Sequence, residues 1–289
     1  MTGFSAEPMT VRVPATSANL GAGFDSLGLA LSLYDEVTAH VTTEPTVVTV
    51  EGEGAGVLPG DDSHLVASAF RVACEVFGSR APNVAIHCRN TIPQARGLGS
   101  SSAAIVAGMS LAAGLVLDHT MDEAELLRVA AEMEGHPDNV APCLLGGFTI
   151  AWTERNGAKA VRLEPAADLP LTVYVPNGSG LTSHARAALP GRVPHVDAAF
   201  NISRAALAVH AVTVDPSLLV AATEDRLHQR YRRDVMPRTI RLVDRLRESG
   251  VPAVVSGAGP SVLAFDQEIK FFEGFDCHRV KVGTGISRL

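Results

Sequence analysis

The sequence predicts a globular protein that combines helices and strands, and three observations lead to this expectation. Its 289 residues are 46% hydrophobic and 19% charged, which is typical of a chain with a sizeable core. In the first half, segments with strand-like alternation are interspersed with segments of helical periodicity. No internal repeat or low-complexity segment is evident. The length allows one large domain or two modest ones.

The first half contains most of the regular pattern. Strands are predicted at 11–13, 33–41, 46–52, 83–89, 148–152 and 159–163. A helix from His64 to Phe77 places its apolar residues on one face, and Gly78 is expected to end it. Asp122 and Glu125 have the spacing of a capping box at the start of a further helix. A hairpin turn is expected at residues 156–157.

The second half is predicted to alternate in the same way. A strand begins at Leu171, helices cover about 196–212 and 238–249, and Gly250 follows the second helix. Residues 253–265 indicate a strand, a glycine turn and a strand, and 278–283 form a last strand. No clear linker separates the halves, and we place the domain boundary near residue 165, giving domains 1–165 and 166–289.

Composition excludes several classes of function. The formal net charge of −7 argues against nucleic acid or an anionic membrane as the main partner. The four cysteines form no CxxC pair, which favours reduced thiols in a cytoplasmic protein. The longest apolar run, 103–117, is too short to span a bilayer comfortably, and no secretory signal is visible at the start.

The most informative segment is RGLGSSSAA, residues 96–104, which precedes a long apolar run. Gly97 and Gly99 allow the backbone to approach an anion closely, and Ser100–Ser102 could cap the helix that follows. The unpaired N–H groups at a helix start, together with the helix dipole, form a phosphate cradle. A serine hydroxyl there could also reach Mg²⁺. The alternative is an ordinary capped helix behind a flexible loop, and the segment is not a Walker A motif.

Three other segments carry polar residues in unusual density. PATSANLGAGFDSLGLAL, residues 14–31, mixes polar residues with glycines, and the alternative is a tight loop after a strand. EMEGHPDNVAP, residues 132–142, leads into an apolar stretch, which favours a half-buried site over a solvated helix end with an Asx-turn. SGAGPS, residues 256–261, is a glycine turn, and such turns are common in hairpins.

In this order the four motifs resemble the GHMP kinase superfamily, over nearly the whole chain. The first and third are typical, within that superfamily, of the homoserine kinases, whereas mevalonate and galactose kinases share the serine loop. The resemblance implies an α+β fold of two domains with the active site in the cleft between them. The N-terminal domain would contain a left-handed βαβ unit, which simple handedness rules do not predict, and the C-terminal domain would be ferredoxin-like.

The resemblance also implies ATP and Mg²⁺. It assigns the nucleotide to His64, Arg96, Gly97, Leu98, Gly99, Ser100, Ser101 and Ser102. His64 stands where many relatives carry asparagine. Ser101 would ligate the metal, with Ser100 as the alternative. Glu132 would supply the carboxylate ligand, with Glu134 as the nearby alternative.

L-Homoserine is the substrate that the resemblance implies. It assigns this amino acid to Asn19, Asp25, His136, Asn139, Thr182, Arg186 and Arg232. Asp25 and Asn19 suit an ammonium group, and the arginines suit a carboxylate, with Arg230 and Arg233 as alternatives to Arg232.

Asn139, Glu132 and Ser101 are the expected catalytic residues. Asn139 falls where some superfamily kinases place an aspartate as general base, and an amide cannot accept that proton. We therefore expect catalysis by orientation and charge stabilisation.

Two other functions fit the same motifs. One is a GHMP kinase for another small alcohol, which Asp25 and the arginines disfavour. The other is a ligand sensor that has lost catalysis, which the glycine-serine loop, Glu132 and Asn139 disfavour. The family further implies a homodimer.

Overall fold

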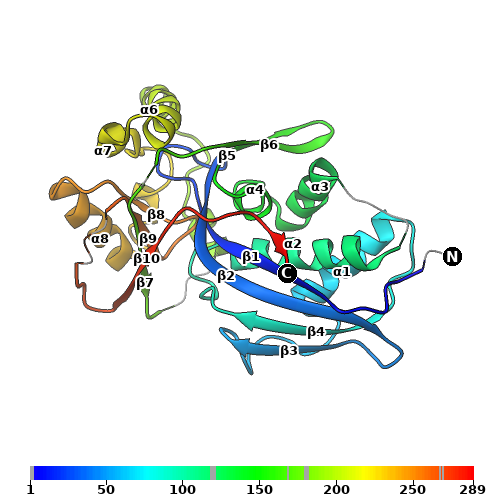
Figure 1. The fold of residues 1–289 in the computed structure, drawn as a ribbon. Helices are drawn as coiled ribbons and strands as arrows, with labels where there is room; N and C mark the ends of the chain where they lie inside the picture. Colours follow the sequence, from blue (N-terminus) through cyan, green and yellow to red (C-terminus); the bar gives the residue numbers. More distant parts are fainter. Residues whose placement is uncertain (1–2, 118–121, 168, 179–181, 267, 269) are drawn as a thin grey trace.

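Two β-sheets, with helices around them, organise the chain (Figure 1). The computed structural model describes residues 3–117, 122–167, 169–178, 182–266, 268 and 270–289. The side chains of 182–184 also lie outside the description. Among the described residues, none of the helices has the length and hydropathy needed to span a membrane.

The first sheet has seven strands among the described residues, in the order β11-β1-β2-β4-β3, with the β5–β6 hairpin attached to β2. Their bounds are β1 Met9–Ala18, β2 Leu27–Thr42, β3 Val47–Gly52, β4 Asn83–Asn90, β5 Phe148–Glu154, β6 Gly157–Leu163 and β11 Ser287–Arg288. All predicted strands of the first half are present, and several extend beyond the predicted residues. The hairpin turns where it was expected, with Glu154 paired to Gly157.

Strand β2 pairs with two different strands at different points along its length. Its first residues, Leu27–Leu29, pair with β5, and Glu36–Thr42 pair with β4. The continuous apolar run 27–31 is buried throughout, whereas burial alternates from Asp35 onward. The alternation made only the second part recognisable as a strand, because a strand covered on both faces loses its period of two.

A βαβ unit lies at one edge of this sheet, where β3 and β4 run parallel and are connected through α1 (Leu65–Val76). The expected His64–Phe77 helix is confirmed, and Gly78 follows it with φ +67°. Helix α2 (Ser100–Leu115) packs closely on α1. A Cβ on Gly108 would lie 2.2 Å from the carbonyl oxygen of Val66, so this glycine permits the approach of the two helices.

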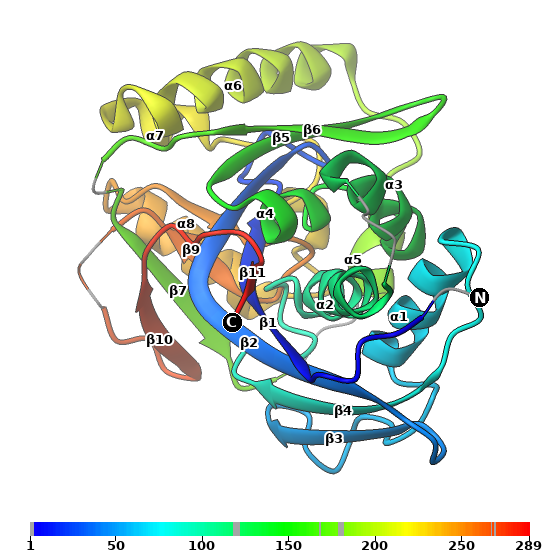
Figure 2. The ribbon, with the colours of Figure 1, turned by 45° about the vertical axis from the view of Figure 1, so that its right-hand side comes forward.

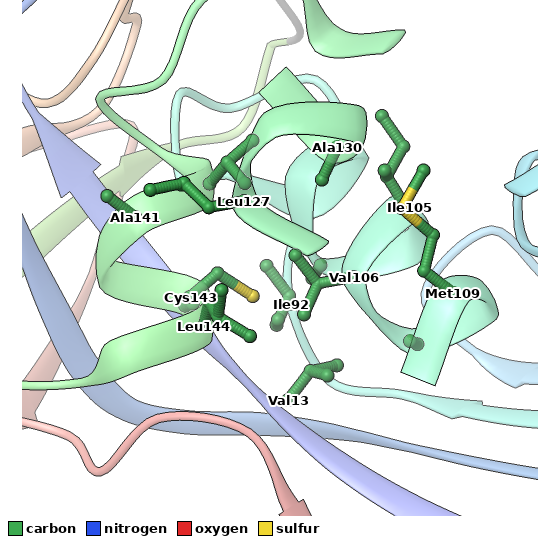
Figure 3. Packing of buried hydrophobic residues seen from close by; sticks show 14 of the residues in the cluster. Val13, Ile92, Ile105, Val106, Met109, Leu127, Ala130, Ala141, Cys143 and Leu144 are labelled. Atoms are coloured by element: carbon green, nitrogen blue, oxygen red, sulfur yellow. The ribbon is translucent and has the colours of Figure 1, made fainter. Parts of the chain in front are cut away.

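The main core fills the space between this sheet and its helices. Helix α3 (Glu123–Glu134) starts as predicted, because the Asp122 side chain accepts a hydrogen bond from Glu125 N. Helix α4 (Val140–Leu145) follows it after a short polar turn. Figure 3 shows apolar side chains of β1, α2, α3 and α4 meeting in this core. Burial of these apolar side chains supplies most of the free energy that holds the helices against the sheet.

The second sheet has the antiparallel order β10-β7-β9-β8 among the described residues, which is the strand order of a ferredoxin-like fold. Its strands are β7 Leu171–Pro176, β8 Ala253–Val255, β9 Val262–Ala264 and β10 Phe275–Val280. The helices of this half are α5 Thr182–Ala187, α6 His195–Thr213, α7 Leu219–Ala222 and α8 Pro237–Glu248. Helices α6 and α8 confirm the two predicted helices, whereas α4, α5 and α7 were not predicted.

The chain does not divide cleanly at one point. The sheets change between Leu163 and Leu171, close to the predicted boundary at 165. Residues 281–289, however, return to the first sheet, where Arg288 of β11 pairs with Val11 and Gly147 N donates to Gly283 O. Figure 2 shows this C-terminal trace leaving β10 and ending beside β1. The last residues of the chain therefore pair with the first sheet, although they follow the strands of the second.

Candidate active site

A cleft of about 570 Å³ opens between the two sheets, and all four sequence motifs line it. Asn19 comes from the loop after β1, and Gly97 from the loop before α2. Asn139 follows α3, and Gly257 belongs to the turn between β8 and β9. Segments that are far apart in sequence thus meet in one concave site, the usual setting for a small-molecule ligand.

The glycines of the loop before α2 are required by close packing. Gly97 has φ +73°, and a Cβ there would lie 2.4 Å from the carbonyl oxygen of Ser256. Gly99 has φ +70°, and its Cβ would lie 1.9 Å from Thr16 Oγ1. The loop is therefore wedged between β1 and the 256–261 turn, in a backbone conformation that side chains disfavour. This explains why glycine motifs occur at both places in the sequence.

The serines after Gly99 do not cap α2, so that prediction is wrong. Gly99 is the N-cap residue, and none of the described side chains caps the helix. The first helical bond runs from Ala103 N to Gly99 O, which leaves the preceding N–H groups outside the helix ladder. Ser102 is buried, whereas Ser100 and Ser101 line the cleft. An uncapped helix start at a cleft wall keeps its partial positive charge available to an anion.

Two residues of the same loop act structurally through their side chains. Leu98 is buried in the core at 1% exposure. The Arg96 guanidinium donates to the carbonyl oxygens of Pro176 (3.0 Å) and Gln94 (2.9 Å). Arg96 thereby ties the loop to the end of β7. The contribution of these two residues to nucleotide binding would come from their backbone.

The structure distinguishes the two glutamates at the end of α3. Ser101 Oγ donates to Glu134 Oε1 at 2.6 Å, and Glu134 lines the cleft. Glu132 points elsewhere and pairs with Arg128, whose Nη1 lies 3.1 Å from Glu132 Oε1. Two positions along a helix differ by about 200° around its axis, so both cannot face Ser101. Of the two candidates for the carboxylate ligand, Glu134, which was the alternative, lines the cleft beside Ser101, whereas Glu132, the expected ligand, does not.

His64 lines the cleft and also begins α1. Its Nδ1 accepts a hydrogen bond from Val66 N at 3.2 Å. This bond leaves the proton of the neutral ring on Nε2. Burial lowers the pKa of His64, which favours the neutral form at neutral pH. A histidine thus replaces the small capping residue that usually occupies such a position.

Asn139 lies beside the start of α2, with its amide orientation fixed. Thr16 Oγ1 donates to Asn139 Oδ1 at 2.9 Å, in a contact buried from solvent. A Cβ on Gly99 would come within 3.3 Å of the same oxygen. Because Oδ1 already accepts this bond, the Asn139 amide presents its NH₂ group as a donor. Thr16 was not among the predicted site residues, although it lies in the first motif.

His136 and Asp138 form a close pair in the same wall. The His136 Nδ1 lies 2.8 Å from Asp138 Oδ1, and the Asp138 side chain is 2% exposed. Burial lowers the pKa of His136, but its contact with Asp138 and the charges of Asp138 and Glu134 outweigh burial, so the pKa is raised. The pairing holds His136 toward the cleft, and sequence analysis did not anticipate it.

The cleft also carries complementary charges. Arg186 makes a fork to Asp25, with Nη2 to Oδ1 at 2.7 Å and Nη1 to Oδ2 at 3.1 Å. Asn19 Oδ1 accepts a bond from Asp25 N at 2.9 Å, which fixes the carboxylate-bearing residue. Arg186 comes from α5 and Asp25 from the loop after β1, so this ion pair bridges the cleft.

Arg232 is the arginine of its group that reaches the cleft. It is 1% exposed, and its Nη1 donates to Gly257 O at 3.0 Å. Burial and the charge of Arg186 lower its pKa to about 10. Arg230 pairs with Asp197 and Arg233 with Asp244, outside the cleft. The side chain of Thr182, the remaining predicted site residue, lies outside the described part of the structure.

Comparisons with known proteins show the family of this chain. Residues 64–147 match the family model for the GHMP kinases N terminal domain. The homoserine kinase of Streptomyces avermitilis is 53% identical over 267 residues, which cover 92% of this chain and 88% of the relative. The homoserine kinase of Mycolicibacterium vanbaalenii is 46% identical over 296 residues, covering 96% and 94%.

Solved structures show the same fold. The homoserine kinase from Cytophaga hutchinsonii has a TM-score of 0.83 at 26% identity, over 99% of this chain and 98% of that one. The mevalonate kinase of L. major, solved with R-mevalonate, has a TM-score of 0.71 at 14% identity, over 98% and 99%. The second likeness bears on the fold alone.

Proposed function

The chain belongs to the homoserine kinases of the GHMP kinase family, and we propose that the cleft between its two sheets is where the reaction takes place. The enzyme transfers the γ-phosphoryl group of ATP to the side-chain hydroxyl of L-homoserine, giving O-phospho-L-homoserine, a step of threonine biosynthesis. Phosphoryl transfer depends on positioning and charge stabilisation more than on covalent chemistry by the protein. The residues of the cleft can supply both.

The nucleotide end is formed by the loop 94–99 and the start of α2. Backbone N–H groups there face outward from an uncapped helix, and the two glycines keep the loop surface free of side chains. His64 is the residue we assign near the nucleoside. Arg96 and Leu98 hold the loop in place, so their roles at the nucleotide would be carried by the main chain.

Ser101 and Glu134 fit a Mg²⁺ ion bound together with ATP. Their oxygens lie 2.6 Å apart at the start of α2, and Mg²⁺ prefers oxygen ligands. The described residues contain no cluster of three or more acidic, histidine or cysteine side chains that could hold a metal. This suits Mg²⁺, which usually takes one or two carboxylates and completes its shell with water and phosphate oxygens. When bound, the ion would neutralise phosphate charge.

Homoserine would occupy the end that carries Asp25, Arg186 and Arg232. Its ammonium group matches Asp25 and the Asn19 amide oxygen, and its carboxylate matches a guanidinium fork. In the unliganded structure Asp25 and Arg186 satisfy each other. A zwitterionic substrate can replace this ion pair, because its ammonium group can pair with Asp25 and its carboxylate with Arg186. The Arg232 Nε lacks a hydrogen-bond partner among the described residues, which supports an anion beside this buried guanidinium.

Asn139 would orient the acceptor hydroxyl between the two ends. Its NH₂ group can donate to the hydroxyl oxygen, whereas its own oxygen is held by Thr16. An amide in this arrangement cannot act as general base. The hydroxyl proton would leave late, to a phosphate oxygen. Orientation of the hydroxyl is therefore the contribution we assign to Asn139.

The observation that carries the proposal is the presence, in one cleft, of an uncapped helix start and a charge set that matches an amino-acid zwitterion. The test is ADP release with ATP and Mg²⁺ over a panel of small alcohols. We expect turnover of L-homoserine far above that of the same alcohol chain without its carboxylate or ammonium group. Preferential turnover of an uncharged alcohol would identify a kinase for another substrate. Tight ATP binding without turnover of any alcohol would identify a ligand sensor.

The assembly and the compartment are further proposals. A homodimer and a cytoplasmic location are what the family implies. Light scattering on the purified protein measures the mass in solution, and the chain of 30.2 kDa would give twice that value as a dimer.

A further inference from the structure

The loop that carries Asn19 and Asp25 is strained. Asn19, Leu20 and Asp25 are not glycine, yet they have φ of 69°, 43° and 54°, and Gly21 between them has φ of 79°. Non-glycine residues rarely adopt this region, and such conformations persist where the surroundings hold them in place. Contacts from the surrounding structure must therefore hold residues 19–25 in this conformation.

Buried side chains from the second half of the chain bind this loop from behind the cleft. His228 Nε2 lies 2.8 Å from Gly21 O, and its ring stacks on Phe24 with centroids 5.0 Å apart. Asn201 Nδ2 donates to Ala22 O at 3.2 Å. His228 is fully buried and Asn201 is 2% exposed. Because a carbonyl oxygen only accepts, the proton of the His228 ring is on Nε2.

The carboxylate of Asp225 positions these two side chains. Asp225 accepts from the N–H groups of His228 (3.1 Å), Leu227 (2.8 Å) and Gln229 (2.7 Å). The Asn201 amide also donates to Asp225, at 3.1 Å. Asp225 is remote from the reacting groups and does not line the cleft. Its hydrogen bonds stabilise the turn that carries His228.

We propose that His228, Asn201 and Asp225 form a loop clamp, which holds residues 19–25 in the conformation that presents Asn19 and Asp25 to the amino-acid substrate. The three are positioning residues, since none of them touches the substrate side of the cleft. The clamp acts on homoserine and not on ATP, because the loop 94–99 receives none of its bonds. This inference rests on the proposed function for its kinetic readout.

The test compares two variants of equal polarity, His228→Gln and His228→Asn. The Gln amide nitrogen can reach the position of Nε2 and donate to Gly21 O, whereas the Asn side chain is too short. We expect His228→Asn to raise the KM for homoserine by roughly 5- to 50-fold, the range for losing one buried hydrogen-bond partner. The KM for ATP should stay within about 2-fold, and His228→Gln should recover most of the loss.

A control variant separates the clamp from general destabilisation. Thr172→Val removes another buried bond of the second half, from Thr172 Oγ1 to Asp266 O at 2.7 Å. It should leave both KM values unchanged. Equal changes of the two KM values in His228→Asn, or no difference between Asn and Gln, would overturn the clamp.

Hydrogen exchange of residues 19–25 in the unliganded protein gives a readout that does not depend on the substrate. Faster exchange in His228→Asn than in His228→Gln is expected, and identical exchange would contradict the clamp. Absence of homoserine turnover in the wild-type protein would refute the proposed function, while this exchange comparison would still decide the clamp.

Discussion

The two ends of the cleft differ in the chemical groups that they present, because one offers main-chain groups and the other offers charged side chains. At the end where we propose that the nucleotide binds, the loop 94–99 and the start of α2 offer main-chain groups, and Gly97 and Gly99 make room for them. At the end where we propose that the amino acid binds, charged side chains such as Asp25, Arg186 and Arg232 are available for recognition. The first end is formed mainly by one contiguous segment, with His64 assigned beside it, whereas the second draws on segments more than 150 residues apart.

This difference follows from the ligands. A phosphate chain is recognised by many equivalent N–H groups, which a helix start supplies from consecutive residues. An amino-acid zwitterion needs one anion and one cation at a fixed separation, and only side chains carry full charge. The backbone end should therefore be sensitive to added volume, and the side-chain end to changed charge or geometry. Five predictions test this contrast, in order of decreasing expected effect.

Gly97→Ala should give the largest loss. Its Cβ would lie 2.4 Å from Ser256 O, a main-chain atom that cannot move without the 256–261 turn. We expect kcat/KM to fall at least about 100-fold, as displacement of a catalytic segment by an ångström does. Gly78→Ala is the matched control, since Gly78 also has positive φ but nothing lies within 4 Å of the added atom. Steady-state kinetics with both substrates measures the effect, and equal losses in both variants would mean that strain, not volume, matters.

Arg186→Lys should reduce kcat/KM for homoserine by about 10- to 100-fold, because lysine replaces a bidentate fork with a point charge. The KM for ATP should hardly change. Arg192→Lys, at an exposed position of the same region, serves as the control. If Arg186→Lys left homoserine kinetics unaltered, the amino-acid end would not depend on fork geometry.

Asn139→Asp tests how the acceptor hydroxyl is activated. A carboxylate beside the transferring phosphoryl group adds repulsion and removes the NH₂ donor, so we expect kcat to fall by about 10-fold. If the site lacks only a base, the same change should raise kcat. A clear gain, measured at saturating homoserine, would refute the base-free mechanism.

Glu134→Gln should raise the Mg²⁺ concentration needed for half-maximal rate by about 10-fold, through loss of a charged ligand. Glu132→Gln should have little effect, because Glu132 pairs with Arg128 on the exposed side of α3. Titration of activity with Mg²⁺ separates the two. The opposite ranking would return the metal ligand to Glu132.

The smallest effect concerns stability and comes from Asp35, which anchors the start of the nucleotide loop. Its Oδ1 accepts from Thr91 N at 2.6 Å and from Ile92 N at 2.9 Å. Burial, opposed by these two bonds and reinforced by the charge of Glu53, raises its pKa from 3.8 to about 6. Between these values the folded state holds more protons than the unfolded state. The free energy of unfolding should therefore decrease as pH rises from about 4 to about 6.

Asp35→Asn should remove that dependence. The Tm of the variant relative to wild type should increase by a few degrees, roughly, between pH 4 and pH 6, and stay level above. Asp61→Asn is the control with the opposite sign, because bonds from Ser63 lower the pKa of that exposed carboxyl from 3.8. Its Tm relative to wild type should fall as pH rises toward about 4 and stay level between pH 4 and pH 6. Thermal unfolding from about pH 3 to pH 7 checks both, and a Tm difference for Asp35→Asn that does not vary between pH 4 and pH 6 would contradict the assignment for Asp35.

Local sequence patterns predicted the elements whose signals are local. The alternation in 148–163, the helical periodicity of 64–77 and the Asp122–Glu125 spacing all gave elements close to those observed. The buried start of β2 and the short helix α4 were missed, because buried segments lack a polar face and short ones lack periodicity. Strand β11 was missed because two residues pair only through the tertiary position of β1.

By itself, the sequence determined the family and the four motifs of the cleft, among them the glycine-serine loop that we propose binds phosphate, since each motif is a run of consecutive residues. Only the tertiary structure decided which member of each polar group faces the cleft: Glu134 over Glu132, and Arg232 over Arg230 and Arg233. It also supplied Thr16 as the partner that orients Asn139. The physical reason is that the direction of a side chain depends on its position around the helix axis and on packing against distant segments. Residues adjacent in sequence do not determine that packing.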